Sequence, residues 1–241
     1  MDLSLILILL LIAFIGCTLQ SSTGFGYGIF TVAALPLVLP YQEAIALSMM
    51  CGGIISGTLA FKNRDKLRLD VLWPCLLANN IVLVASLIFS LGQSDAMLTR
   101  ALGAVLMLLS LYFFFFSDKI RVKPTIVNAL IIGIISGMGA GFFGLGGPPV
   151  VIFLLAALNN KEEYRATLAV QFLCNSIIAT AIRLMNGIIT FQLVQVSILS
   201  IGPILLGIWL GGHFFRLMSE KTLRRVVYVF MAISGLFMLV G

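Results

Sequence analysis

A glycine-rich break inside a long apolar run places the strongest constraint on how this chain can fold. Residues 142–149 read Phe-Phe-Gly-Leu-Gly-Gly-Pro-Pro, between the largely apolar stretches 131–140 and 150–158. Each glycine costs a helix about 1 kcal/mol relative to alanine, and Pro148 suits only the first turn of a new helix. The pattern predicts a helix, a break and a second helix. A similar break lies at residues 24–28, Gly-Phe-Gly-Tyr-Gly.

The apolar segments around these breaks predict an all-α integral membrane protein. The chain is 61% hydrophobic and 10% charged, whereas a soluble domain carries about 25% charged residues. Two apolar segments, 28–39 and 148–158, are too short to cross a bilayer comfortably, and each directly follows a break. Segments long enough, or nearly so, for about 30 Å of hydrocarbon are 3–23, 44–61, 71–91, 97–116, 124–141, 164–185, 191–212 and 222–240.

The polar residues argue against several other classes of protein. The single histidine, His213, sits at a helix end, and the four cysteines lie in apolar segments without metal-ligand spacing. We therefore expect no metal, no cofactor and no enzymatic activity. The net charge of +6 comes from short loops between apolar spans, which is typical of membrane topology and not of nucleic-acid binding. All nine acids lie at segment ends or in loops, which disfavours a cation substrate.

The order of segments predicts an internal duplication. A shift of 120 residues places Gly24 on Gly144, Gly26 on Gly146 and Glu43 on Glu163. The predicted halves are residues 1–118 and 119–241, which together form one transmembrane domain. Each half has about four helices, and the first helix of each is broken by glycine.

The distribution of basic residues predicts that the two halves are inverted. If each broken unit enters and leaves on one side, thirteen Lys and Arg residues fall in cytoplasmic loops and only Arg100 and Arg183 fall outside. Full crossing by every long segment would give no such bias. Inverted repeats bring equivalent elements together near the midplane, so the two glycine breaks are expected to meet there.

The meeting point of the breaks is the predicted site for a small anion. Helix N-termini present unpaired N–H groups and about half a positive charge, and the short helices starting near Gly28 and Pro148 would aim theirs at this point. The alternative is that the glycines only permit close helix packing, which we assign to the motifs 53–57 and 133–137, Gly-Ile-Ile-Ser-Gly in both cases. The predicted binding residues are Gln20, Ser21, Ser22, Thr23, Gly24, Gly26, Gly28, Phe143, Gly144, Gly146, Gly147, Pro148, Gln171, Asn175 and Arg183.

Three polar residues have alternative interpretations. Arg183 is either an anion-attracting residue of an outer vestibule or a charge at a helix end that extends to the interface. Asn79 and Asn80 lie in the middle of an apolar segment and are either interhelical hydrogen-bonding residues or pore lining.

The two breaks resemble the paired glycine-rich G-x-G-G-G motifs of the sulfite exporter TauE/SafE family. The resemblance rests on residues 24–28 with Pro36, on residues 144–147, and on length, segment count and duplication. It implies transport of sulfur-containing anions such as sulfite, sulfonates or sulfoacetate. Tyr27 replaces a glycine of the first motif and Pro148 replaces the last glycine of the second, so substrate size or break geometry is expected to differ.

The sequence thus predicts a multi-pass transporter of small anions in the cell (plasma or inner) membrane, working by alternating access. Its expected partners are the anionic substrate and the lipid bilayer, with no nucleic acid; small-residue faces permit a homodimer without requiring one. The alternatives are a passive anion channel and a membrane scaffold subunit without transport.

Overall fold

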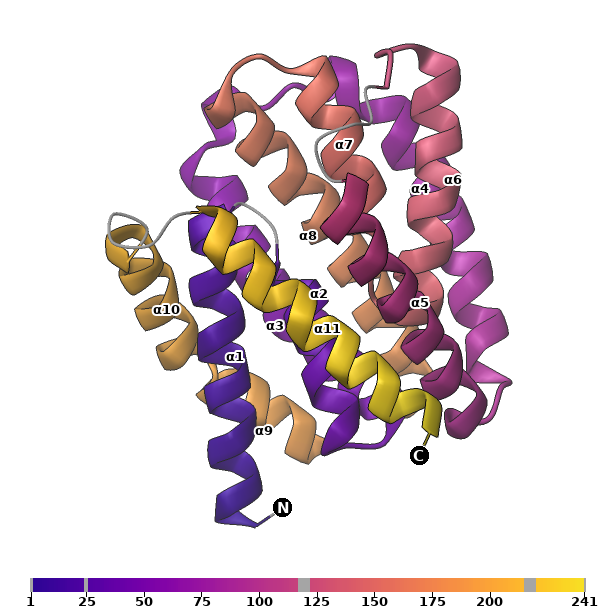
Figure 1. The fold of residues 1–241 in the computed structure, drawn as a ribbon, viewed down its shortest axis with the longest axis vertical. Coiled ribbons are helices and arrows are strands. Elements are labelled where there is room, and N and C mark those ends of the chain that lie inside the picture. Colours follow the sequence, from indigo (N-terminus) through magenta and orange to yellow (C-terminus); the bar gives the residue numbers. More distant parts are fainter. Residues whose placement is uncertain (1, 24–25, 117–121, 215–219, 241) are drawn as a thin grey trace.

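The computed structural model describes residues 2–23, 26–116, 122–214 and 220–240, with side chains described except at 22–23, 115–116, 212–214 and 220–226. This part of the chain is almost entirely helical and contains no strand (Figure 1). The elements are α1 (Leu3–Thr23), α2 (Tyr27–Ala34), η1 (Leu35–Leu37), α3 (Tyr41–Lys62), η2 (Arg64–Lys66), α4 (Leu69–Leu91), α5 (Asp95–Phe116), α6 (Ile126–Phe143), α7 (Gly147–Ala157), α8 (Lys161–Met185), α9 (Phe191–Leu199), α10 (Ile201–Phe214) and α11 (Glu220–Val240).

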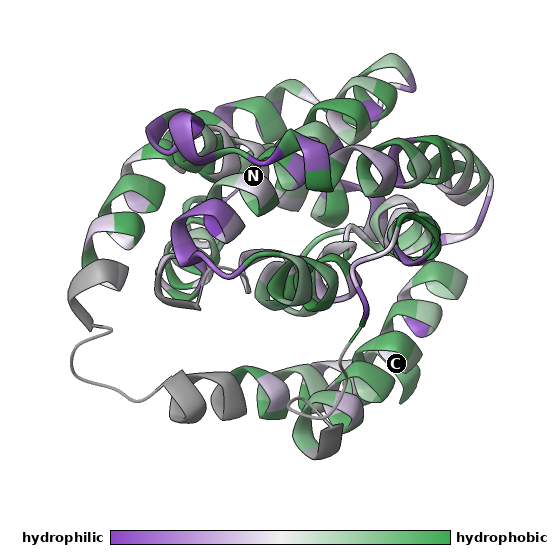
Figure 2. Ribbon diagram, turned by 90° about the horizontal axis from the view of Figure 1, so that it is seen from above, coloured by the Kyte–Doolittle hydropathy of each residue, from purple (hydrophilic) through white to green (hydrophobic). Residues whose placement is uncertain are grey.

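The helices carry the surface of a membrane protein. Among the described residues, seven spans are long and apolar enough to cross a bilayer, with α9 and α10 forming one of them. Large apolar side chains are exposed along their length, such as Ile81 at 70% and Phe237 at 67%. Hydrophobic residues cover most of the helices in Figure 2, and hydrophilic stretches lie mainly on the short connections. The predicted all-α membrane fold is confirmed.

Local sequence signals set the helix ends where the chain turns. Thr125, Asn160 and Thr190 cap α6, α8 and α9, each accepting a hydrogen bond from a backbone N–H of the first turn. Glu43 and Glu163 lie in the first turns of α3 and α8, as the helix dipole favours. The segment expected to be one helix at 191–212 is two, because α9 ends at Leu199 and α10 begins at Ile201.

The two broken helices enter the molecule from opposite ends (Figure 1). We call the end that holds η2 and the α7–α8 connection the basic end, and the opposite end, where the chain begins, the N-terminal end. Helix α1 starts at the N-terminal end, and α2 leads back to it; α6 starts at the basic end, and α7 returns there. The α4–α5 and α8–α9 connections lie at the N-terminal end.

Helix pairing follows the spacing of the predicted duplication. Helix α3 packs on α8, α5 on α11, α4 on α6 and α1 on α10. Tyr27 and Gly147, which begin α2 and α7, are 120 residues apart, as are Tyr41 and Lys161, which begin α3 and α8. The same shift carries α1 onto α6 and α4 onto α9–α10, so the α4–α6 and α1–α10 pairs are equivalent. A two-fold relation between halves predicts this reciprocal pairing.

Glycine contacts allow the paired helices to approach closely. A Cβ on Gly133 would lie 2.5 Å from the Cys75 carbonyl oxygen, and one on Gly137 would lie 2.5 Å from that of Asn79. Gly103 and Gly235 face one another across α5 and α11 in the same way. The packing role predicted for Gly133 and Gly137 is therefore confirmed.

Candidate functional site

A cavity of about 60 Å³ lies where the two glycine breaks meet. Its size allows a few water molecules or one small anion, because a single water needs about 10–15 Å³ measured in this way. A Cβ on Gly28 would lie 3.8 Å from the Gly144 carbonyl oxygen, so the backbones of the two breaks are close neighbours. The cavity is lined by Gln20, Gly26, Tyr27, Gly28, Ile29, Ser48, Met49, Gly52, Ser56, Gly144, Leu145, Gly146, Gly147, Phe172, Asn175 and Ser176.

The first turns of two helices form part of the cavity wall. Residues 27–29 are the first turn of α2, and Gly146 and Gly147 are the N-cap and first residue of α7. Neither N-cap residue has a side chain that bonds to the helix N–H groups. These groups carry the positive end of each helix dipole, so both helix starts favour a negative charge in the cavity.

The cavity offers neutral hydrogen-bond donors and apolar walls. None of the residues that line it is charged. Its polar side chains are the amides of Gln20 and Asn175 and the hydroxyls of Tyr27, Ser48, Ser56 and Ser176, while Met49 and Phe172 are apolar. An anion held here would exchange its hydration for N–H and O–H donors, without forming an ion pair with a Lys or Arg side chain.

Close backbone packing shapes the second break. Gly144 has φ +68°, the left-handed conformation typical of a helix end, and its N–H donates to the Ala140 carbonyl. The Leu145 N–H then donates to the Gly139 carbonyl at 2.9 Å. A Cβ on Gly146 would lie 2.8 Å from the Ser136 carbonyl oxygen and 2.9 Å from the Ala140 Cβ, so the position has no room for a side chain.

A buried chain of hydrogen bonds connects this break to α8 through α4. The Ser136 hydroxyl donates to the Gly146 carbonyl at 2.5 Å and accepts from the Asn79 amide at 2.8 Å. Asn79 in turn accepts from the Gln171 amide at 2.8 Å, which also bonds to Asn175 at 3.2 Å. For Asn79, the structure supports the interhelical alternative. The Asn175 oxygen accepts this bond, and its amide nitrogen makes no hydrogen bond to the described residues, so it is available to donate.

The first break is shaped by one aromatic ring. Gly26 has φ +134°, which strongly favours glycine, and Tyr27 is buried at 3% exposure. The Tyr27 ring lies against Gly16, where a Cβ would be 2.9 Å from it, and against Gly52. The Thr31 hydroxyl, one turn along α2, shares a 2.7 Å hydrogen bond with that of Ser48. Gly24 lies outside the described residues, as do the side chains of Ser22 and Thr23.

Several predicted site residues are not at the cavity. The Ser21 hydroxyl donates to the Ile208 carbonyl of α10 at 2.8 Å, so it joins two helices. Phe143 packs with the core, Pro148 is buried in the first turn of α7, and Gln171 reaches the cavity only through its bond to Asn175. Of the described candidates, those lining the cavity are Gln20, Gly26, Gly28, Gly144, Gly146, Gly147 and Asn175.

The sequence also carries a signal for lining residues that were not predicted. Ser48, Gly52 and Ser56 recur every four residues and form one stripe along α3. Phe172 and Ser176 are likewise four residues apart on α8, and Ser176 lies 120 residues after Ser56. Serine and glycine residues repeated at helical spacing within an apolar segment therefore indicate a helix face that lines a cavity.

The Arg183 side chain is fully buried at 0% exposure, so its charge does not extend to the membrane interface as one of the two interpretations expected. That alternative is wrong. Arg183 does not line the cavity, and it lies two turns beyond Ser176 on α8, toward the N-terminal end.

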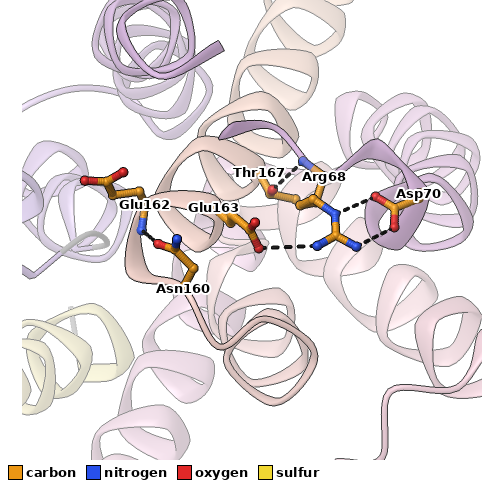
Figure 3. Close-up of polar contacts among 6 residues, drawn as sticks. All are labelled: Arg68, Asp70, Asn160, Glu162, Glu163 and Thr167. Carbon is orange, nitrogen blue, oxygen red and sulfur yellow. Dashed lines mark hydrogen bonds and ion pairs between the residues drawn. The ribbon is translucent and has the colours of Figure 1, made fainter. Parts of the chain in front are cut away.

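At the basic end of the molecule, near the start of α8, charged side chains are paired with one another (Figure 3). The Arg68 guanidinium donates to Asp70 at 2.7 and 2.9 Å and to Glu163 at 3.4 Å. The Arg68 N–H also donates to the Thr167 hydroxyl. This partly exposed cluster ties the start of α4 to the start of α8 at the rim of the molecule.

The family model described as Sulfite exporter TauE/SafE matches residues 8–238, nearly the whole chain. No curated protein and no solved structure matches this chain significantly. The match covers both glycine breaks and all helices that surround the cavity.

Proposed function

Since this chain belongs to the sulfite exporter TauE/SafE family of membrane transporters, we propose that it carries small sulfur-containing oxyanions or organosulfonates across the cell membrane. Sulfite and sulfoacetate are representative substrates. The cavity between the two breaks is the proposed transport site.

The convergence of two helix starts on one uncharged cavity is the observation that carries this proposal. Each start contributes up to about half a positive charge, and each hydrogen bond to an anion contributes about 1.5–3 kcal/mol net. Because two helix starts face this site and no Asp or Glu side chain lines it, it favours a small anion over an organic cation. Binding without a fixed counter-charge also lets the anion leave again, as transport requires.

The arrangement of the two halves supports alternating access as the proposed mechanism. The broken units α1–α2 and α6–α7 enter from opposite ends, and the equivalent pairs α4–α6 and α1–α10 link the halves. We infer an inverted repeat whose halves rock about the cavity, so that it opens to one end and then the other. The basic end is the proposed cytoplasmic side, because membrane proteins retain Lys and Arg there.

Flux measurements on purified protein in liposomes test this proposal. The carrier is expected to move labelled sulfite with saturable kinetics and to be accelerated by unlabelled sulfite on the opposite side. Protein-free liposomes and labelled choline serve as controls and should show no specific flux. A linear, unsaturated sulfite flux without counter-transport would instead support a passive channel, and no flux of sulfite, thiosulfate or sulfoacetate would support a scaffold subunit.

A further inference from the structure

Arg183 is a buried cation for which the described residues provide no partner. All three guanidinium nitrogens are inaccessible and make no hydrogen bond there. No ion pair to Arg183 is present among these residues either, in contrast to Arg68 at the other end of the molecule. An isolated buried charge costs several kcal/mol unless something compensates it, so its neighbourhood is suited to an anion.

The position of Arg183 places it on the same side of α8 as the cavity. Phe172 and Ser176 line the cavity, and Arg183 follows them by eleven and seven residues. At 100° per residue, all three lie within about 20° of one line along the helix. Arg183 is therefore about 10.5 Å beyond Ser176, in the direction of the N-terminal end. Fully buried Ala179, the small residue between them, adds little bulk along this line.

Tyr41 connects the surroundings of Arg183 to the second break. Its hydroxyl, which interacts electrostatically with the guanidinium, donates to the Phe142 carbonyl at 2.6 Å, two residues before Gly144. Asp95 also acts on Tyr41 electrostatically, but it is exposed and makes no ion pair with Arg183.

We propose that Arg183 forms a second anion-binding site, between the cavity and the N-terminal end of the molecule. Its ligand is a small oxyanion of the same class as the proposed substrate, which the guanidinium nitrogens bind when the proposed rocking of the halves exposes them. An anion would occupy this site before entering the cavity or after leaving it. The inference rests on the proposed function for the identity of the ligand, but the binding site itself can be tested without transport.

The first test compares thermal unfolding of Arg183→Gln, Arg100→Gln and the wild-type protein in anion-poor buffer. Arg100 is an exposed arginine near the same end, so its variant controls for the loss of one positive charge. Removing an uncompensated buried charge should leave the melting temperature of Arg183→Gln equal to or above that of the wild type. A clear decrease confined to Arg183→Gln would mean that the guanidinium has an internal partner, and would overturn the proposal.

The second test titrates sulfite and sulfate into Asn175→Leu, in which the cavity site is weakened. The remaining anion-dependent stabilisation should shift to at least tenfold higher concentration when Arg183→Gln is added, and should stay unchanged with Arg100→Gln. An unchanged midpoint with Arg183→Gln, or no stabilisation by either anion in any variant, would overturn the second site. Binding through Arg183 without sulfite flux in liposomes would refute the proposed function and leave this inference standing.

Discussion

The two glycine breaks lie 120 residues apart in the chain, but different interactions hold them. At the second break, the Ser136 hydroxyl bonds to the Gly146 carbonyl, beside Gly147 at the start of α7. At the first break, the residue 120 positions before Gly147 is Tyr27, and its ring packs against Gly16, which is 120 positions before Ser136. Ser136 and Gly147 at the second break thus correspond to Gly16 and Tyr27 at the first. A hydrogen bond holds the second break, whereas packing of an aromatic ring against a glycine holds the first.

This difference shows that hydrogen bonds position one wall of the cavity and that ring packing positions the other. The second break is tied by Ser136 to Asn79 and Gln171, so its backbone is positioned by hydrogen bonds from α6, α4 and α8. The first break depends on ring packing, which has less directional preference than hydrogen bonding. We therefore expect substitutions at the second break to affect the geometry of binding, and substitutions at the first to affect mainly stability.

Gly146→Leu is expected to have the largest effect on transport. The new side chain would meet the Ser136 carbonyl and Ala140 within 3 Å, and the carbonyl belongs to the helix backbone and cannot move aside. Sulfite flux should fall at least a hundredfold while the protein remains inserted. Gly202→Leu is the matched control, because nothing lies within 4 Å of a Cβ there. Full flux in Gly146→Leu would show that the second break is incidental.

Tyr27→Ala should cause the largest loss of stability at the first break. The buried ring fills space against Gly16 and Gly52, so truncation leaves a void and should cost about 3 kcal/mol. Thermal unfolding in detergent measures this loss. Phe191→Ala serves as control, since Phe191 is 76% exposed and should be nearly neutral. If the two variants unfolded at the same temperature, ring packing would not be what holds the first break.

Ser136→Ala should lower stability by a smaller amount, about 1–3 kcal/mol, and also weaken sulfite binding. It leaves the Gly146 carbonyl and one Asn79 donor unpaired in a buried region. Ser197→Ala removes a buried hydroxyl that bonds only to Val194 in its own helix, and should change binding little. Equal binding by both variants would contradict the positioning role given to the hydrogen-bond chain.

Ser21→Ala should have the smallest effect. Its hydroxyl bonds to Ile208 and does not line the cavity, so sulfite affinity should change less than twofold. Stability should fall by about 1 kcal/mol from the lost interhelical bond. Sulfite titration measures the first effect and thermal unfolding the second. A tenfold loss of affinity would place the Ser21 hydroxyl in the binding site after all.

The sequence predicted the features that depend on local chemistry. Glycine and proline locate both breaks, the 120-residue spacing reproduces the starts of α2, α3, α7 and α8, and the breaks meet as expected. Side-chain direction was less predictable. Ser21 points to α10 and Arg183 points inward because of helix neighbours that are distant in sequence, and the burial of Tyr27 depends on space left by Gly16.

The central claim is that an anion binds in the cavity between the breaks, and calorimetric titration of Asn175→Leu tests it most directly. Asn175 contributes an amide donor to the cavity wall, and leucine keeps its approximate size. Removing this donor should weaken sulfite binding about tenfold, whereas Gln192→Leu on α9, outside the cavity, should leave it unchanged. Equal sulfite affinity in Asn175→Leu and the wild type would contradict the assignment of the cavity as the transport site.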